Sequence, residues 1–224
     1  MELRENLERV KERIERAKRN APNPKEPVWL VGITKGVAPE RIREAVLAGL
    51  VTFGENRVQE AREKVGQFSE TIRWHMVGSL QTNKAKEAVR LFHLIHSVDS
   101  FRLAQALEKE ASSLKKEIPV LIQVNMRQNE RQSGISPDGV IALARGIAPM
   151  GHLKLSGLMM IAPFVEAEKA RPYFKELRHL KEHLEQEKIP NVTMRYLSMG
   201  MTNDFEVAVE EGANLVRIGR GIFG

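Results

Sequence analysis

The 224-residue chain contains no cysteine, and this absence removes several kinds of chemistry at once. Without thiols there is no disulfide, no thiolate metal site and no cysteine nucleophile. The N-terminal segment has no uninterrupted apolar stretch of the kind that directs export. No segment approaches the roughly 20 apolar residues needed to cross a bilayer. We therefore expect a cytoplasmic protein with no membrane partner.

Aromatic residues are also scarce, at 5% of the chain, although the formal net charge is +6. A positive charge can serve nucleic-acid binding, because Lys and Arg neutralise phosphates. Here, however, acidic and basic residues alternate from Glu2 to Arg19 at the four-residue spacing of an exposed helix. No basic stretch carries the interleaved Phe or Tyr that would stack on bases. We expect no nucleic-acid partner.

Short apolar segments alternate with amphipathic ones from residue 28 onwards. The predicted strands are Val28–Ile33, Val51–Phe53, Ile72–Val77, Leu94–Val98, Pro119–Val124, Leu153–Ile161, Thr193–Leu197 and Leu215–Ile218. The predicted helices between them are Pro39–Ala48, Val58–Gln67, Lys84–Phe92, Phe101–Lys116, Pro137–Ala148, Glu166–Glu187 and Asp204–Glu211. Because a helix follows each strand, the strands are expected to pair in parallel. The pattern favours an α/β fold, a single (β/α)8 TIM barrel over residues 1–224, against an open doubly wound sheet.

An extra helix precedes the first strand, since Leu3, Leu7, Val10 and Ile14 recur at helical spacing. The sequence after the last predicted strand shows no eighth helix. We therefore expect the N-terminal helix to cover that part of the barrel wall.

Lys35 directly follows the first predicted strand, and chemistry in this fold gathers where strands end. Its amine is expected to point into the barrel mouth. Desolvation there favours a neutral amine, which can form an imine with an aldehyde. A rim lysine that extends into water is the alternative interpretation.

The loops after predicted strands seven and eight are rich in small residues. They comprise residues 198–204, with Ser198, Gly200 and Met201, and residues 219–221, with Gly219 and Arg220. Such loops are the usual phosphate site of these barrels, because backbone N–H groups can approach phosphate oxygens. Two ordinary turns would look the same.

Three further residues are candidates for ligand contact. Arg217 is embedded in the last apolar strand, so its charge needs a partner. That partner is either a structural ion pair or the ring nitrogen of a pyridine in the mouth. Asn56 and His75 lie near the ends of predicted strands two and three, where they are placed to touch a ligand. The pair His179 and His183 indicates a solvated helix face, and we expect no metal site.

Several motifs together resemble the pyridoxal phosphate homeostasis proteins of the YggS/PROSC type. These motifs are Thr34-Lys35, residues 53–60 (FGENRVQE), residues 74–84 (WHMVGSLQTNK), residues 198–201 (SMGM) and residues 217–219 (RIG). The similarity runs along the whole chain. The sequence is also similar to the barrel domain of bacterial alanine racemases, without their second domain. Val37 and Gln132 stand where many relatives have lysine.

The resemblance implies a cofactor site for pyridoxal 5′-phosphate, with Lys35 as the Schiff-base lysine. It implies that Ser198, Gly200, Met201, Gly219 and Arg220 hold the phosphate. Arg217 would face the pyridine nitrogen. Family members are regarded as cofactor-binding proteins that affect vitamin B6 balance, without an established catalytic activity.

The leading hypothesis is therefore a monomeric protein that sequesters pyridoxal phosphate and delivers it to apo-enzymes. The alternative is an amino-acid racemase of weak activity. Racemisation needs an acid/base group on each face of the substrate, and Lys35 supplies only one. The tyrosines, Tyr173 and Tyr196, fall in a predicted helix and a predicted strand. A third hypothesis is a barrel enzyme that uses Lys35 to form an imine with a sugar phosphate.

Overall fold

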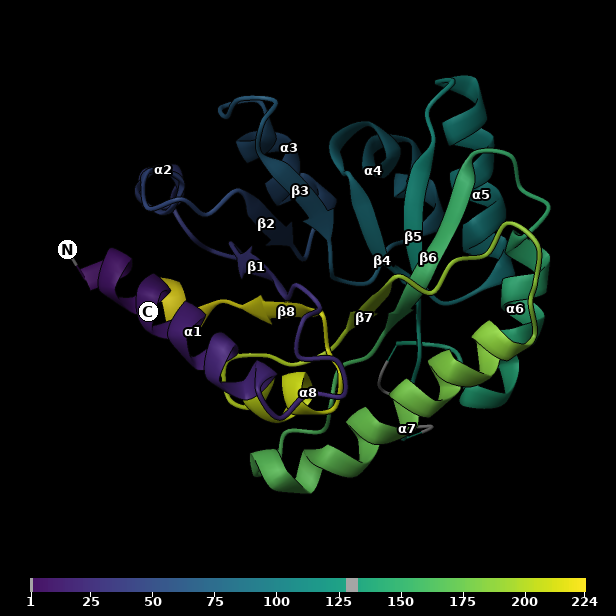
Figure 1. Cartoon of the computed structure of the whole chain (residues 1–224). Helices are drawn as coiled ribbons and strands as arrows, with labels where there is room; N and C mark the ends of the chain where they lie inside the picture. The colour runs from purple at the N-terminus through teal and green to yellow at the C-terminus, as the bar shows by residue number, and fades with distance from the viewer. Residues whose placement is uncertain (1, 128–132) are drawn as a thin grey trace.

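The strands close into a parallel barrel in the computed structural model, which describes residues 2–127 and 133–224 (Figure 1). Each strand pairs in parallel with its neighbours along the chain, and β8 returns to pair with β1. The strands of the described part are β1 (Trp29–Ile33), β2 (Thr52–Glu55), β3 (Arg73–Met76), β4 (Leu94–Val98), β5 (Ile118–Gln123), β6 (Leu153–Met159), β7 (Tyr196–Ser198) and β8 (Leu215–Ile218). The predicted TIM barrel with an N-terminal helix is confirmed.

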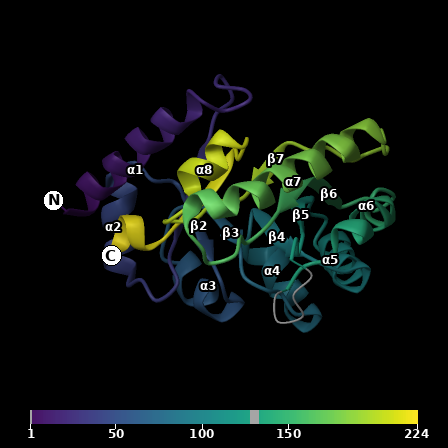
Figure 2. The same cartoon turned by 90° about the horizontal axis from the view of Figure 1, so that it is seen from below.

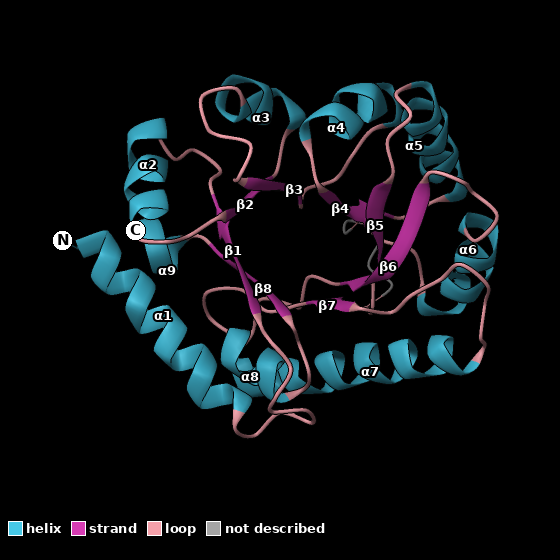
Figure 3. Ribbon diagram, turned by 45° about the horizontal axis from the view of Figure 1, so that its top comes forward, coloured by secondary structure: helices cyan, strands magenta, loops and turns pink. Residues whose placement is uncertain are grey.

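Helices form an outer ring around these strands, as Figure 3 shows. Those of the described part are α1 (Glu2–Lys18), α2 (Pro39–Leu47), α3 (Val58–Val65), α4 (Ala85–Leu91), α5 (Phe101–Ser113), α6 (Val140–Ile147), α7 (Ala167–Gln186), α8 (Phe205–Glu210) and α9 (Arg220–Phe223). The main apolar core lies between this ring and the outer face of the barrel. Its largest fully buried side chains include Trp74, Phe53 and Phe174.

Helix α1 packs against α2, α8 and α9, where it covers the wall beside β8 and β1 (Figure 2). Its buried face is the predicted one, with Leu7 fully buried. The guanidinium of Arg13 lies 4.6 Å from the centre of the Phe205 ring on α8 and pairs with Glu206 at 2.7 Å.

Two expectations need correction. The chain does form one short helix after β8, since α9 packs against α1 and Asn6 donates to the Ile222 carbonyl.

The second correction concerns strand seven, which was expected at Thr193–Leu197 and instead begins at Tyr196. The Thr193 amide donates to the Leu155 carbonyl before the β6–β7 ladder starts at Gly157 and Tyr196. Ser198 therefore lies within β7 and not in the loop after it. Its side chain points into the barrel interior, where its hydroxyl group contacts Arg217 and His96.

The barrel interior contains an apolar cluster and a polar group of side chains. The cluster is formed by Val31, Leu94, Leu121, Met159 and Leu215. His75, His96, Ser198 and Arg217 are buried beside it and are joined to one another by hydrogen bonds. Buried polar groups need such partners, and this set becomes important for the site.

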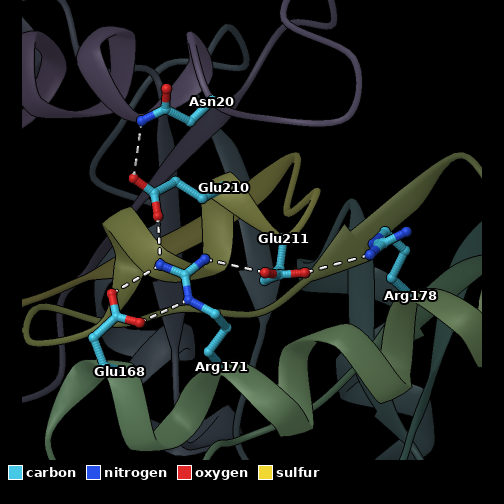
Figure 4. A network of polar contacts seen from close by, with 6 residues as sticks. All are labelled: Asn20, Glu168, Arg171, Arg178, Glu210 and Glu211. Carbon is cyan, nitrogen blue, oxygen red and sulfur yellow. Dashed lines mark hydrogen bonds and ion pairs between the residues drawn. The ribbon is translucent and has the colours of Figure 1, made fainter.

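A partly exposed ion-pair network connects α7 to α8 (Figure 4). Arg171 on α7 pairs with Glu168 at 2.7 Å, with Glu210 at 2.6 Å and with Glu211 at 3.0 Å. Arg178 reaches Glu211 at 3.4 Å. The hydrogen bonds that Arg171 donates to these carboxylates raise its pKa, and the bond to Glu168 contributes most. The network fixes α8, and with it the loop between β7 and α8.

Replacing Arg171 by alanine is expected to lower the free energy of unfolding by about 1 kcal/mol, because partly exposed ion pairs are screened by water but here three act together. Arg90→Ala is a matched control, since Arg90 is exposed on α4. Chemical denaturation measures both. Equal midpoints for the two variants would contradict a stabilising role for the network.

Candidate functional site

A cavity of about 630 Å³ opens at the carboxyl ends of the strands. It lies on one side of the mouth, between residues that follow β1, β6, β7 and β8. Five predicted site residues line it: Lys35, Met201, Arg217, Gly219 and Arg220. The fold thus brings together residues that are up to 185 positions apart in the sequence (220 minus 35).

The described lining carries more positive than negative charge. Lys35, Arg217 and Arg220 are its basic side chains, and Asp204 is the one acidic side chain of the described lining. The rest is mostly apolar, with Ile33, Phe223 and the 89% exposed Phe164 at the rim. A cavity with apolar walls and surplus cations suits a flat ligand that carries a negative charge.

Side chains hold the backbone on both sides of Lys35, and those before it are buried. Before it, the Thr34 hydroxyl donates to Glu55 Oε1 at 2.6 Å, and Lys64 Nζ donates to the Thr34 carbonyl at 2.7 Å. Lys64 also pairs with Glu55 Oε1 at 2.7 Å. After it, the Gly36 amide donates to Glu60 Oε2 at 3.2 Å.

Gly36 adopts φ +68°, a left-handed conformation that glycine adopts at little cost, and this sharp turn follows Lys35 directly. The Lys35 side chain is exposed at the cavity and has no hydrogen bond or ion pair with the described residues. The desolvation expected from the sequence is therefore absent. The backbone is thus held on both sides of Lys35, while its amine has no partner among the described residues.

Arg217 lies on β8, where its side chain is buried and lines the cavity. Its Nη1 donates to Ser198 Oγ at 2.6 Å and its Nη2 donates to the Met160 carbonyl at 2.8 Å. Burial lowers the pKa of Arg217 to about 10, and the nearby Asp204 carboxylate opposes this shift. The guanidinium stays charged near neutral pH, with further N–H donors left for a ligand in the cavity.

Ser198 and His75, two other predicted site residues, belong to the barrel interior and do not line this cavity. Ser198 Oγ lies 3.0 Å from His96 Nδ1, and His96 Nε2 lies 3.1 Å from His75 Nδ1. Ser198 was predicted in the loop after strand seven, and His75 near the end of strand three. Ser198 is instead the last residue of β7, His75 lies in β3, and their side chains connect Arg217 to the barrel interior.

The loop after β7 is held from both sides. Asp204 Oδ1 accepts from the Met201 amide at 2.6 Å, and Thr202 Oγ1 accepts from the Gly221 amide at 3.4 Å, which joins this loop to the one after β8. Burial raises the pKa of the Asp204 carboxyl group. Gly200 has φ +91°, and a Cβ there would lie 2.7 Å from Ala208 Cβ. Close packing against α8 therefore explains why residue 200 is a glycine.

Two predicted residues stay apart from the cavity lining, and sequence reasoning missed others. Asn56 follows β2 but does not line this cavity, and neither does Gly200. Asp204 was assigned only to a helix start, although an acidic residue after a small-residue loop could have drawn attention. His96 was missed because it sits mid-strand among apolar residues. Val37 lines the cavity, while Gln132 lies outside the described residues.

Two further observations concern the described residues only. His179 and His183 are exposed on α7, and no cluster of three or more metal-ligating side chains occurs in residues 2–127 and 133–224. None of the described helices combines the length and the apolar character needed to span a bilayer.

Comparison with known proteins first defines the class of this barrel. Residues 6–224 match the family model of the alanine racemase N-terminal domain. An alanine racemase of Clostridium difficile 630 shares the fold, with a TM-score of 0.76 at 16% identity, and this chain covers 55% of it. The chain therefore belongs to the alanine racemase N-terminal domain family and has its barrel fold.

Closer relatives identify the family within that class. A pyridoxal phosphate homeostasis protein of Aquifex aeolicus is 42% identical over 98% of this chain and 96% of its own length. The Escherichia coli protein of the same name is 33% identical over the full chain. The solved structure of PipY from Synechococcus elongatus, with pyridoxal phosphate bound, superposes with a TM-score of 0.87 at 33% identity, covering 99% of this chain and all of PipY. The chain belongs to the pyridoxal phosphate homeostasis proteins, which confirms the resemblance drawn from its motifs.

Substitution of Lys64 by methionine is expected to lower the free energy of unfolding by about 3 kcal/mol, because it leaves the fully buried Glu55 carboxylate without its cation. Lys86→Met, at an exposed position on α4, serves as control. Denaturant titration compares the two. Adding Glu55→Gln to the Lys64 variant is expected to restore part of the loss, and no restoration would contradict the proposed cause.

Proposed function

We propose that this protein binds pyridoxal 5′-phosphate in the cavity at the carboxyl ends of the strands and takes part in vitamin B6 homeostasis. Lys35 holds the aldehyde of the cofactor as a Schiff base. The single observation that carries the proposal is the position of Lys35, whose amine is unpaired within the described structure and faces the same cavity as the buried Arg217.

The described residues fit this cofactor in three respects. A cavity of about 630 Å³ accommodates a substituted pyridine with a phosphate arm. Arg217 retains N–H donors toward the cavity, and a pyridine nitrogen is an acceptor. The surplus of positive charge from Lys35, Arg217 and Arg220 complements a phosphate. The bound cofactor in PipY, a relative of 33% identity, supports the same ligand here.

Each side chain has a distinct part in holding the cofactor. The Lys35 amine, as its free base, forms the C=N bond while one water molecule leaves. Arg217 donates a hydrogen bond and so favours an unprotonated ring nitrogen. The phosphate arm is assigned to Met201, Gly219 and Arg220, which line the cavity. Ser198 and Gly200 support this phosphate site indirectly. Ser198 accepts a hydrogen bond from Arg217, and Gly200 packs closely against α8.

The same geometry favours binding over racemisation. A bound pyridoxal ring supplies an electron sink to an amino acid only when its nitrogen attracts electrons strongly, and a neutral ring nitrogen beside Arg217 weakens that effect. Tyr173 lies on α7 and Tyr196 at the opposite end of the barrel, so neither reaches Lys35. Asp204 is the other proton-exchanging group of the described lining, and its Oδ1 is occupied by the Met201 amide.

The proposal extends to a cytoplasmic carrier that acts as a monomer and passes the cofactor to apo-enzymes. The cavity is open at its rim, where Phe164 is exposed. An exposed Schiff-base lysine is accessible to a competing amine, and exchange of the imine between two amines consumes no other reactant.

Lys35→Ala is expected to abolish the visible absorbance of the cofactor-loaded protein and the borohydride-stable mass increase, because the variant has no amine at that position. Absorbance spectroscopy and peptide mass spectrometry measure the two effects. Lys86→Ala, which removes an exposed lysine elsewhere, is expected to leave both unchanged. An unaltered spectrum in the Lys35 variant would refute the proposal.

Racemisation of L-alanine by the loaded protein is expected to remain at the rate of free pyridoxal phosphate, since only one face of the cavity presents a free base. Chiral chromatography of the reaction mixture gives the rate. A rate at least tenfold above the free cofactor, lost in Asp204→Asn, would instead favour the racemase alternative.

A further inference from the structure

A second cavity, of about 380 Å³, opens at the other end of the barrel. Its lining includes the first residues of six strands: Trp29, Thr52, Arg73, Leu94, Tyr196 and Leu215. It therefore lies at the amino ends of the strands. It shares no lining residue with the cavity that contains Lys35.

Apart from Tyr196, the ionisable side chains of this cavity are all basic. Arg73, His75 and His93 line it, and the described lining contains no carboxylate. Burial lowers the pKa of His75 to about 3, with smaller contributions from His93 and Arg73. Burial also lowers the pKa of His93, followed by Arg73 and Lys116. The site thus combines a permanent cation with two neutral imidazoles.

The hydrogen bond from the backbone determines the tautomer of His93. The Trp74 amide donates to His93 Nδ1 at 3.1 Å, so Nδ1 accepts. A neutral imidazole that accepts at Nδ1 carries its proton on Nε2. His93 is therefore a hydrogen-bond donor through Nε2.

A similar argument determines the tautomer of His75, starting from Arg217. A guanidinium only donates, so Ser198 Oγ accepts from Arg217 Nη1. Among the described residues His96 Nδ1 is the other partner of this hydroxyl, and only as an acceptor does it satisfy the Ser198 proton, so we assign Ser198 as the donor to His96 Nδ1. Neutral His96 then carries its proton on Nε2 and donates it to His75 Nδ1. His75 in turn carries its proton on Nε2.

The donor-only character of Arg217 thus directs every proton in this chain toward the second cavity. His75 is the last member of the chain and lines that cavity. Its Nε2–H has no acceptor among the described residues. This donor is open to the cavity, where a ligand atom that accepts can bind it.

The remaining walls of the second cavity are apolar and aromatic. The rings of Trp29 and Tyr196 meet edge to face, with centroids 5.3 Å apart, and the Arg195 guanidinium lies 5.3 Å from the Trp29 ring centre. Val51, Leu94, Pro119 and Leu215 add aliphatic surface, and Thr52 is the other polar residue of the lining. Such walls suit a flat apolar group.

We propose that this cavity is a second binding site, for a small organic anion in which a carboxylate is attached to a flat apolar group. Arg73 and the Nε2–H groups of His75 and His93 bind the carboxylate. The aromatic and aliphatic walls bind the apolar part. Arg217 determines the donor at His75 from the other end of the barrel, so the two cavities share one chain of hydrogen bonds.

Benzoate is the probe for this site, in isothermal titration calorimetry of the full chain without added cofactor. Arg73→Gln is expected to weaken benzoate binding about tenfold, since it removes the permanent charge. Arg220→Gln is the matched control, because Arg220 provides the same charge at the first cavity. It is expected to leave the benzoate affinity unchanged. Benzamide, the uncharged analogue, is expected to bind about tenfold more weakly than benzoate.

Three results would overturn the proposal. One is the absence of benzoate binding to the wild-type chain. Another is equal affinity in the wild-type chain and Arg73→Gln. The third is a loss of affinity in Arg220→Gln in place of Arg73→Gln, which would put the anion in the first cavity. Because no cofactor is added, these results are independent of the proposed pyridoxal phosphate site.

Long-range ¹H–¹⁵N NMR of the imidazole rings tests the direction of the hydrogen-bond chain. We expect His75, His93 and His96 to be neutral with the proton on Nε2, and benzoate to shift the Nε2 signals of His75 and His93. Ser198→Ala, which removes the donor to His96 Nδ1, is expected to introduce the other tautomer at His96 and His75. A proton on His75 Nδ1 in the wild-type chain would overturn the proposed direction.

Discussion

The buried charge of Arg217 is the constraint around which the barrel interior is arranged. Its guanidinium stays charged near neutral pH, so its N–H donors need acceptors inside the fold. Ser198 Oγ and the Met160 carbonyl take two of them, and the Asp204 carboxylate lies close enough to act on its charge. The remaining donors face the cavity at the carboxyl ends of the strands, and the chain through Ser198 carries the same polarity to the opposite end.

Two ion-pair systems on either side of the first cavity have different physical characters. The Glu55–Lys64 pair is buried and holds the end of β1 next to Lys35, so loss of one partner leaves a charge without compensation. The Arg171 network is partly exposed and fixes α8, which carries the loop that ends at Asp204. The position of the lysine therefore depends on a buried interaction, whereas the opposite wall depends on several weak ones.

Membership of the pyridoxal phosphate homeostasis proteins and the shared barrel of alanine racemases have different implications. In this chain Lys35 follows the first strand of the barrel and Arg217 lies on the last. This chain covers 55% of the alanine racemase it matches, and in the described residues its tyrosines lie away from Lys35. This arrangement is sufficient for the proposed carrier, because holding the aldehyde requires only the Lys35 amine, the Arg217 donor at the ring nitrogen and positive charge near the phosphate.

The sequence by itself determined the strand–helix alternation, the buried face of α1 and the motifs around Lys35, because these depend on local periodicity and on residues close together in the chain. Loops after β7 and β8 could be assigned to the cavity once the strands were counted. Tertiary structure alone decided that Ser198 and His75 face the interior, that His96 connects them, and that Asn56 stays outside the cavity lining. The face that a strand residue presents depends on its pairing with the neighbouring strand, such as Met159 of β6 with Ser198, because a slip of one residue would reverse it, and no local pattern encodes that pairing.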